Sequence, residues 1–241
     1  MTKLSFAVTA WSAWSPVLES KAAWLQWAGK TGSPSLGAES PTPALLRRRV
    51  SPLGQKALKA AWALPDAAVA PMVFCSRHGE FGRTLSILDS LVSRAEVSPA
   101  DFTLSVHNAL AGLLSIACAN RQGHTMIAAG AESFGFGMLE ALARLAERPD
   151  EPVLLVYFDE RLPVPFDAFD DNATQPIALA MTLSVSGGER LTLDTHPANG
   201  AGVSGEPAVM AFMRTMLGAS SHSVSVGEQL VWNWRNGDAA A

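Results

Sequence analysis

Charged residues are scarce in this chain. They make up 17% of its 241 residues, against roughly a quarter in an ordinary soluble domain. The 18 basic and 22 acidic residues give a net charge of −4, which excludes a nucleic-acid binder that works through a basic surface. Hydrophobic residues make up 48%, which excludes disorder. A lone domain of this length needs more charge to cover its surface, so we expect a partner protein to bury part of it.

Cysteine is equally rare. Cys75 and Cys118 are the two cysteines of the chain, and each lies among apolar neighbours. This setting predicts buried free thiols and not a disulfide framework. The two residues lack the spacing of a metal site, and we expect neither a metal ion nor another cofactor.

The sequence also has no run of residues typical of a membrane-spanning segment. The longest uncharged run, residues 102–120, is long enough to cross a bilayer, but it contains several polar residues that a lone membrane helix does not tolerate. The N-terminal apolar stretch alternates like a strand and lacks the cleavage site of a signal peptide. The sequence predicts a cytoplasmic protein without an integral membrane segment.

Strand and helix patterns alternate along the chain. Periodicity and turn residues predict a mixed α/β sheet covered by helices. The Gly-containing turn 185–188 predicts a hairpin between its two flanking strands. The expected strands are 4–10, 71–76, 124–129, 152–158, 177–184, 190–195 and 226–235. The expected helices are 45–64, 81–94, a segment that starts near Ser98 and runs through 102–119, 138–147 and 207–217.

The segment 127–135 is the strongest candidate for a catalytic or binding motif, and two hypotheses explain it. It reads as a strand, a Gly-containing turn over 130–137 and a helix, an arrangement that often presents a nucleophile to backbone N–H groups. Ala131 to Gly135 is a degenerate form of the G-x-S-x-G motif, so one hypothesis is a serine hydrolase of the α/β-hydrolase type with Ser133 as nucleophile. Candidate partners for that serine are Asp159 or Asp171 with His196 or His222.

A second hypothesis comes from family resemblance. Asn108 to Ile116 is similar to the N-x-x-A-G-x-L-x-I helix of β-ketoacyl synthases, and Ile127 to Ser133 resembles their A-x-A-C-x-S elbow. Other segments follow in the family's order over residues 4–185. They are Trp14 to Pro16, the Arg47 to Arg49 helix, Phe74 to Gly79, Arg121 to Thr125 and Pro165 to Asp167.

The resemblance implies a thiolase-like fold that is truncated relative to a full ketosynthase. Residues 4–185 correspond to the ketosynthase N-terminal half, and residues 186–241 form a C-terminal extension that replaces the second half within one domain. The family's nucleophilic cysteine is replaced by Ala131, and the two histidine motifs of the second half have no counterpart. An acyl thioester requires a thiolate, so the resemblance implies a non-catalytic chain-length factor.

That family assignment also implies partners. Such a factor, most similar to those of aryl polyene clusters, forms a heterodimer with an active ketosynthase and shapes the tunnel for an acyl or polyene chain held by an acyl carrier protein. A homodimeric thiolase-like binding protein is a further alternative. Candidate tunnel or interface residues are Val106, His107, Asn108, Leu110, Leu113, Glu132, Phe134 and Phe136. Candidate carrier-protein docking residues are Arg47, Arg48 and Arg49.

Several of these residues have plainer explanations. His107 fits a core or interface histidine bound to the backbone. Glu132 fits an anion held at a helix N-terminus, and the three arginines fit a solvated helix end. If a partner does bind, the exposed apolar surface is expected on residues 102–120 together with the strand that begins at His124.

Overall fold

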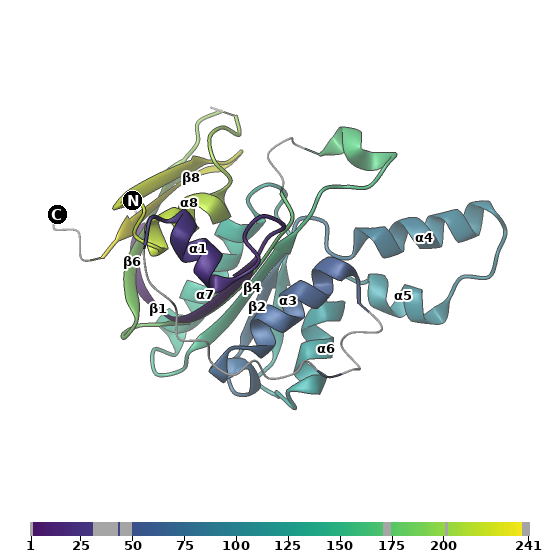
Figure 1. Ribbon diagram of the computed structural model, residues 1–241, viewed down its shortest axis with the longest axis horizontal. Coiled ribbons are helices and arrows are strands. Elements are labelled where there is room, and N and C mark those ends of the chain that lie inside the picture. Colours follow the sequence, from purple (N-terminus) through teal and green to yellow (C-terminus); the bar gives the residue numbers. More distant parts are fainter. Residues whose placement is uncertain (1, 31–42, 44–49, 171–174, 201, 238–241) are drawn as a thin grey trace.

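The computed structural model describes residues 2–30, 43, 50–170, 175–200 and 202–237. Eight strands form one mixed sheet in the order β3-β2-β4-β5-β1-β6-β8-β7 (Figure 1). In this sheet β2 is parallel to β3 and β4, and the other neighbours are antiparallel. The strands are β1 (Thr2–Trp14), β2 (Met72–Cys75), β3 (His124–Ile127), β4 (Val153–Asp159), β5 (Ile177–Ser184), β6 (Glu189–Pro197), β7 (His222–Val226) and β8 (Leu230–Asn236).

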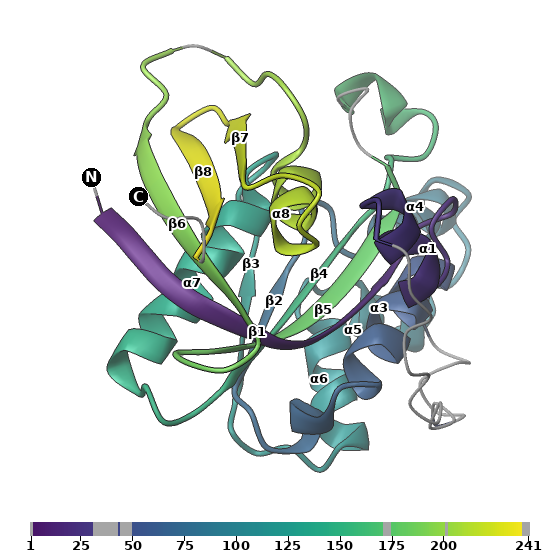
Figure 2. The ribbon, with the colours of Figure 1, turned by 60° about the vertical axis from the view of Figure 1, so that its left-hand side comes forward.

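Strand β1 joins the two halves of this sheet. Its C-terminal part pairs with β5 and its N-terminal part pairs with β6, and the β5 register shifts between Val8 and Ala10. The view in Figure 2 shows the sheet twisting strongly along β1, so that β6, β8 and β7 turn away from β2 and β4. The twist leaves room for helices between the two arms of the sheet.

Helices cover the two faces of the sheet and enclose two hydrophobic cores. Helices α3 and α6 contribute Leu58 and Leu114 to one core, and α7 and α8 contribute Met138 and Phe212 to the other. Helices α4 and α5 extend away from the sheet (Figure 1) and bury none of their side chains. The helices are α1 (Lys21–Trp27), α3 (Pro52–Trp62), α4 (Phe81–Val92), α5 (Pro99–Ser105), α6 (Ala109–Ala117), α7 (Ser133–Glu147) and α8 (Ala208–Met216), with short 3-10 turns at Pro65–Ala68 and Phe166–Phe169.

The helices expected over 45–64 and through 102–119 differ from the structure. The helix expected over 45–64 is described from Pro52, where Ser51 caps the N-terminus by accepting from the Gly54 N–H; residues 44–49 lie outside the described part. The helix expected through 102–119 is two helices, α5 and α6. Val106 has an extended backbone at the break, and the ring of His107 lies 3.0 Å from the carbonyl oxygen of Ser76. This tertiary contact holds the chain in the break.

The expected hairpin between residues 177–184 and 190–195 is wrong. Both strands exist, but β1 lies between them and pairs with each. The connection over residues 185–188 must therefore cross β1 itself, near Val8 and Thr9. Gly188 makes this crossing possible, since its φ is +57° and a Cβ there would lie 2.0 Å from the Val8 carbonyl oxygen.

This close approach gives a testable difference between adjacent glycines. We expect Gly188→Ala to lower the free energy of unfolding by about 3 kcal/mol, because the methyl group meets backbone atoms and the φ is strained. Gly187 has a φ of +82°, and a Cβ there would come no closer than 3.7 Å to Thr9. Gly187→Ala should therefore cost about 1 kcal/mol. Urea denaturation of both variants measures the difference, and equal losses would contradict the crossing.

The last predicted strand also needs correction. Residues 222–236 form the hairpin β7–β8, and the expected strand 226–235 combines the end of β7, its turn and most of β8. Cys75 is buried and Cys118 half-buried, and both thiols are free. Within the described residues, no helix is long and apolar enough to span a membrane.

Candidate functional site

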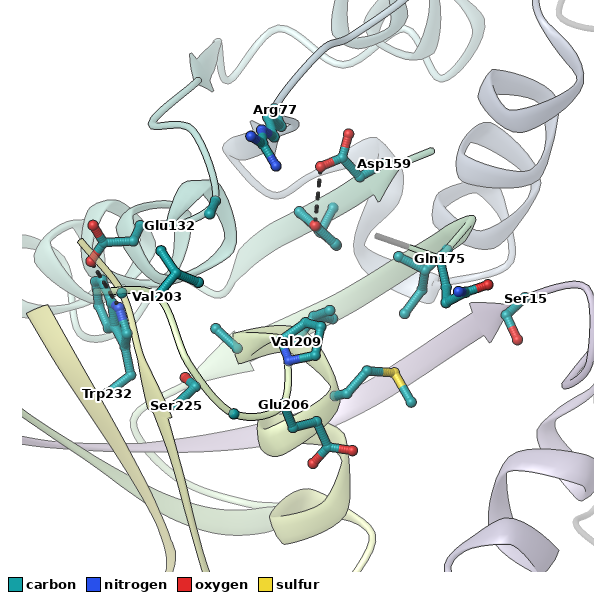
Figure 3. Close-up of a pocket in the computed structure, with 18 of the residues that line it drawn as sticks. Ser15, Arg77, Glu132, Asp159, Gln175, Val203, Glu206, Val209, Ser225 and Trp232 are labelled. Carbon is teal, nitrogen blue, oxygen red and sulfur yellow. Dashed lines mark hydrogen bonds between the residues drawn. The ribbon is translucent and has the colours of Figure 1, made fainter. Parts of the chain in front are cut away.

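A cavity of about 320 Å³ opens beside the turn between β3 and α7 (Figure 3). We call residues 128–132 the elbow. Ala131 and Glu132 form part of the cavity wall, and the end of β4 forms another part. The loop 203–207 with the start of α8, the segments 15–18 and 175–177, and the end of β7 with its turn contribute further parts of the wall. The pocket thus joins elements from both ends of the chain.

The elbow is shorter than the predicted turn. Helix α7 begins at Ser133, so residues 133–137 are helical and not part of a turn over 130–137. Gly130 has a φ of +57°, a left-handed conformation that glycine adopts without strain. Gly135 and Gly137 are needed for packing, because a Cβ at either would lie about 2.5 Å from Trp232 or Cys75. The start of α7 therefore lies directly against the sheet.

Ser133 does not have the geometry of a nucleophile. Its Oγ accepts from the Ala129 N–H at 2.9 Å and donates to the Gly130 carbonyl at 2.7 Å, and the residue is 1% exposed. His196 contacts Asn233 through its ring, and His222 is exposed at the start of β7. Among the described residues, neither histidine hydrogen-bonds Ser133. Asp171, the other acid considered for a triad, lies outside the described residues.

Glu132 connects the elbow to the C-terminal hairpin. Its buried carboxylate accepts from the backbone N–H groups of Gln229 and Leu230, at 2.9 and 3.0 Å, and from Trp232 Nε1 at 3.1 Å. Gly227 completes the contact, because a Cβ there would lie 2.3 Å from this carboxyl group. The Glu132 carboxyl group thus lies near a helix N-terminus, where the dipole favours a negative charge, and its donors come from the distant β7–β8 hairpin.

Asp159 lies at the end of β4, on the opposite side of the drawn pocket from Trp232 (Figure 3). Tyr157 OH donates to its Oδ2 at 3.4 Å. Burial raises the pKa of Asp159 from 3.8 to about 7, and the nearby charge of Arg77 opposes this shift. Burial, together with the charge of Asp159, raises the pKa of Tyr157 well above its ordinary range. The pocket therefore contains an acid that exchanges its proton near neutral pH.

The predicted tunnel and interface residues fall into two groups. Val106 and Asn108 are exposed and His107 is half-buried, at the break between α5 and α6. The others contribute to packing. Leu110 is in the core and Leu113 packs against it, Phe134 lies in an aromatic cluster with Tyr157, Phe212 and Trp234, and Phe136 packs on Trp232. Glu132 alone of the eight lines the pocket. Arg47, Arg48 and Arg49 lie outside the described residues.

Strand β3 is an edge strand, since β2 is its neighbour on one side and no described strand lies on the other. Ser76 N donates to the Ile127 carbonyl and Met72 N to the Gly123 carbonyl. The backbone groups of residues 124 and 126 therefore point to the free edge. Helix α6 contacts β3, and large apolar side chains are exposed on α6, on α5 and at the break between these helices: Ile116 at 70%, Phe102 at 65% and Val106 at 48%. We call β3 with these three side chains the edge surface.

Two polar residues of the pocket were missed or only partly recognised by sequence reasoning. Asp159 entered only as a possible triad acid, and its position after a buried apolar strand was the available signal. Ser225 was not considered, because one serine in a polar strand carries no signal. Among the described residues, no group of three or more potential ligands for a metal ion occurs.

Comparison with known families decides the classification. The model of the β-ketoacyl synthase N-terminal domain matches residues 21–235. The chain belongs to this family. The predicted family and its mixed-sheet, thiolase-like fold are thereby confirmed.

Solved structures agree with the β-ketoacyl synthase assignment. A chain in the complex of the ketosynthase ApeO with its chain length factor ApeC, from Xenorhabdus doucetiae, is 28% identical with a TM-score of 0.81, over 97% of this chain and 100% of that one. The ishigamide ketosynthase/chain length factor is 15% identical, with a TM-score of 0.58 over 92% of this chain and 75% of that one.

A type II polyketide synthase acyl-carrier protein in complex with its ketosynthase, AntDE:AntF, contains a chain of the same fold. It is 12% identical with a TM-score of 0.69, over 97% of this chain and 99% of that one. No curated protein matches the chain.

Proposed function

We propose that this β-ketoacyl synthase family member is a non-catalytic chain-length factor that pairs with an active ketosynthase. The observation that carries the proposal is Ala131 at the elbow, the position at which the family's A-x-A-C-x-S motif has its cysteine. A methyl group cannot form the acyl thioester required for condensation. The carboxyl oxygens of the adjacent Glu132 already accept hydrogen bonds from three N–H groups. This side chain is therefore unsuited to serve as a substitute nucleophile.

The edge surface supports pairing with another protein. An edge strand with free backbone groups is a template for strand addition from a partner. Beside β3, the groove formed with α7 is lined by Ile127, Phe136 and Leu139, so apolar contacts can flank the backbone pairing. Large exposed apolar side chains, such as those on α5 and α6, are also common at protein interfaces. The low charge of the chain is consistent with burial of this surface.

In this proposal, the growing acyl chain lies on the same side of the molecule as the edge surface. Val106, which belongs to the edge surface, and its neighbours His107 and Asn108 lie at the break between α5 and α6, where they would form part of a tunnel wall shared with the ketosynthase. We further propose that the chain accommodated there is a polyene or related acyl chain delivered by an acyl carrier protein, with Arg47, Arg48 and Arg49 as its docking residues. Residues 186–241, which supply β6, α8, β7 and β8, would replace the second half of a full ketosynthase.

Co-expression tests the pairing. The full chain and an active ketosynthase from the same organism should co-purify as a one-to-one complex that turns over malonyl-carrier protein, whereas the chain alone should show no turnover. Ile116→Arg and His124→Pro should each weaken the complex tenfold or more, because they place a charge or remove a backbone donor on the edge surface. Native mass and titration calorimetry measure both effects.

Val224→Arg is the matched control, since Val224 is an exposed apolar residue on β7, outside the edge surface. This variant should bind the ketosynthase like the wild type. Turnover by the chain alone would refute the non-catalytic role. A stable homodimer that ignores the ketosynthase would favour the alternative, a homodimeric thiolase-like binding protein.

A further inference from the structure

Arg144 on α7 is bound to the middle of the edge strand. Its guanidinium group donates from Nη2 to Thr125 Oγ1 on β3, and from Nε to Oε1 of Glu140 at 2.9 Å. The arginine side chain is 29% exposed, so solvent or a partner can reach its remaining N–H groups. A permanent positive charge is therefore fixed on the strand to which we assign partner binding.

The free edge of β3 limits how a second copy of this chain can pair with it. Two strands related by a two-fold axis in one sheet are antiparallel. The backbone groups of His124 and Met126 point to the free edge, so a pair that uses both residues in each copy places His124 opposite Met126 and Thr125 opposite Thr125. The central Thr125 pair is then not hydrogen-bonded through its backbone, and its side chains lie close together on one face. The two Arg144 side chains bound there would meet at the axis.

This meeting of two arginines is unfavourable. Like charges that lie directly opposite each other destabilise an antiparallel pair. The second copy brings no carboxylate that is unused, because its Glu140 already accepts from its own Arg144. Pairing would also remove both ion pairs from water, which is costly unless new hydrogen bonds compensate.

The groove between α7 and β3 changes character along its length, which adds to this effect. Beside the end of β3 it is lined by Ile127, Phe136 and Leu139. Near the start of β3, at Gln122, a second hollow is lined mainly by Arg144 and other charged side chains of α7 and the loop after it. Two-fold pairing would set the apolar end of one copy against the charged end of the other, and charges buried against apolar groups are destabilising. A different chain is free of this constraint.

We propose that Arg144 selects the partner of the edge surface: it disfavours pairing with a second copy of this chain, and it favours a different chain that carries a carboxylate opposite Thr125. The N–H groups that Arg144 does not use within the chain would donate to that carboxylate. A hydrogen bond between two charged groups is stronger than one between neutral groups. This inference rests on the proposed pairing at β3, and it adds a chemical requirement for the partner strand.

Self-association of the full chain tests the first half of this proposal without a ketosynthase. Sedimentation velocity in the micromolar range should find the wild type monomeric. Arg144→Leu should self-associate at least tenfold more tightly, because the guanidinium groups no longer meet at the axis. Adding His124→Pro to this variant should abolish the dimer, since it removes a backbone donor at the edge. A wild-type dimer that His124→Pro disrupts, or no gain for Arg144→Leu, would overturn the proposal.

Two variants control for the loss of charge. Arg144→Lys keeps the positive charge at the same position and should stay monomeric. Arg148→Leu removes an arginine at the C-terminal end of α7 that is 67% exposed and paired with Glu151, and it should also stay monomeric. An equal gain in self-association for Arg148→Leu would contradict the proposal, because net charge and not the position of Arg144 would then keep the chain monomeric.

Binding to the active ketosynthase tests the second half. In titration calorimetry the wild type should bind most tightly, and Arg144→Glu should bind at least tenfold more weakly than Arg144→Leu, since it sets a negative charge against the partner's carboxylate. Equal affinities of the two variants would contradict a carboxylate opposite Thr125. A wild type that stays monomeric as expected but binds no ketosynthase would refute the proposed function, and not the effect of Arg144 on self-pairing.

Discussion

Glu132→Ala should lower the free energy of unfolding by about 4 kcal/mol. The substitution removes the acceptor for three N–H groups, two in the β7–β8 turn and one on Trp232. Hydrogen bonds to a charged group contribute about 1.5–3 kcal/mol each, and buried donors left without a partner add a penalty. The three losses are coupled, so the total is smaller than their sum. Urea denaturation followed by tryptophan fluorescence measures the change.

A second glutamate on the same helix is the control for this prediction. Glu140 pairs with Arg144 one turn along α7 at 2.9 Å and is partly exposed, so Glu140→Ala should cost about 0.5 kcal/mol or less. Glu132→Gln should fall between the two, because the amide keeps one acceptor oxygen but points an N–H at a donor. A loss below about 1 kcal/mol for Glu132→Ala would show that the carboxylate does not hold the hairpin.

Local pattern was sufficient to predict most elements but not their neighbours in the sheet. Uninterrupted apolar runs correctly placed β2, β4 and β5. Sequence proximity then wrongly paired the strands on either side of residues 185–188, because β1, some 180 residues earlier, lies between them. The alternation of apolar and polar residues along a strand does not indicate which distant strand it pairs with. The break in the helix at Val106 was not predicted for the same reason. The contact made there is between the ring of His107 and the carbonyl oxygen of Ser76, which lies 31 residues earlier in the chain.

The site was predictable to the extent that it lies within one motif. The elbow, with Ala131 and the hydrogen-bonded carboxyl group of Glu132, belongs to one short segment, which motif spacing identifies. The donors to Glu132 come from residues 97 to 100 positions later. The environment of Asp159 depends on Arg77 and Tyr157 together. Such groups become a site only after folding, so a sequence shows them as unrelated polar residues.

The stability of the protein should fall as the pH rises from about 4 to about 7. Burial raises the pKa of Asp159 from 3.8 to about 7, so between these values the folded protein holds a proton that the unfolded chain releases. Stability decreases wherever the folded state binds more protons. A pKa raised from 3.8 to about 7 corresponds to about 4 kcal/mol of stability. The full contribution is present below pH 4 and is lost as the pH passes through 7.

Other groups near Asp159 set the size of this effect without changing its sign. Arg77 favours the charged carboxylate and opposes the shift. Glu160 has its pKa raised by burial and by the charge of Glu80, and it adds a loss of stability in the same direction. The contribution of Asp159 is therefore the difference between the wild type and Asp159→Leu in urea titrations from pH 4 to 8. Relative to the wild type, the variant should be least favoured at pH 4, where the folded wild-type side chain is protonated, and should gain about 4 kcal/mol by pH 8, where that side chain is ionised in both states. A constant difference across this range would mean that Asp159 titrates like an exposed carboxyl, and that its burial imposes no proton uptake on folding.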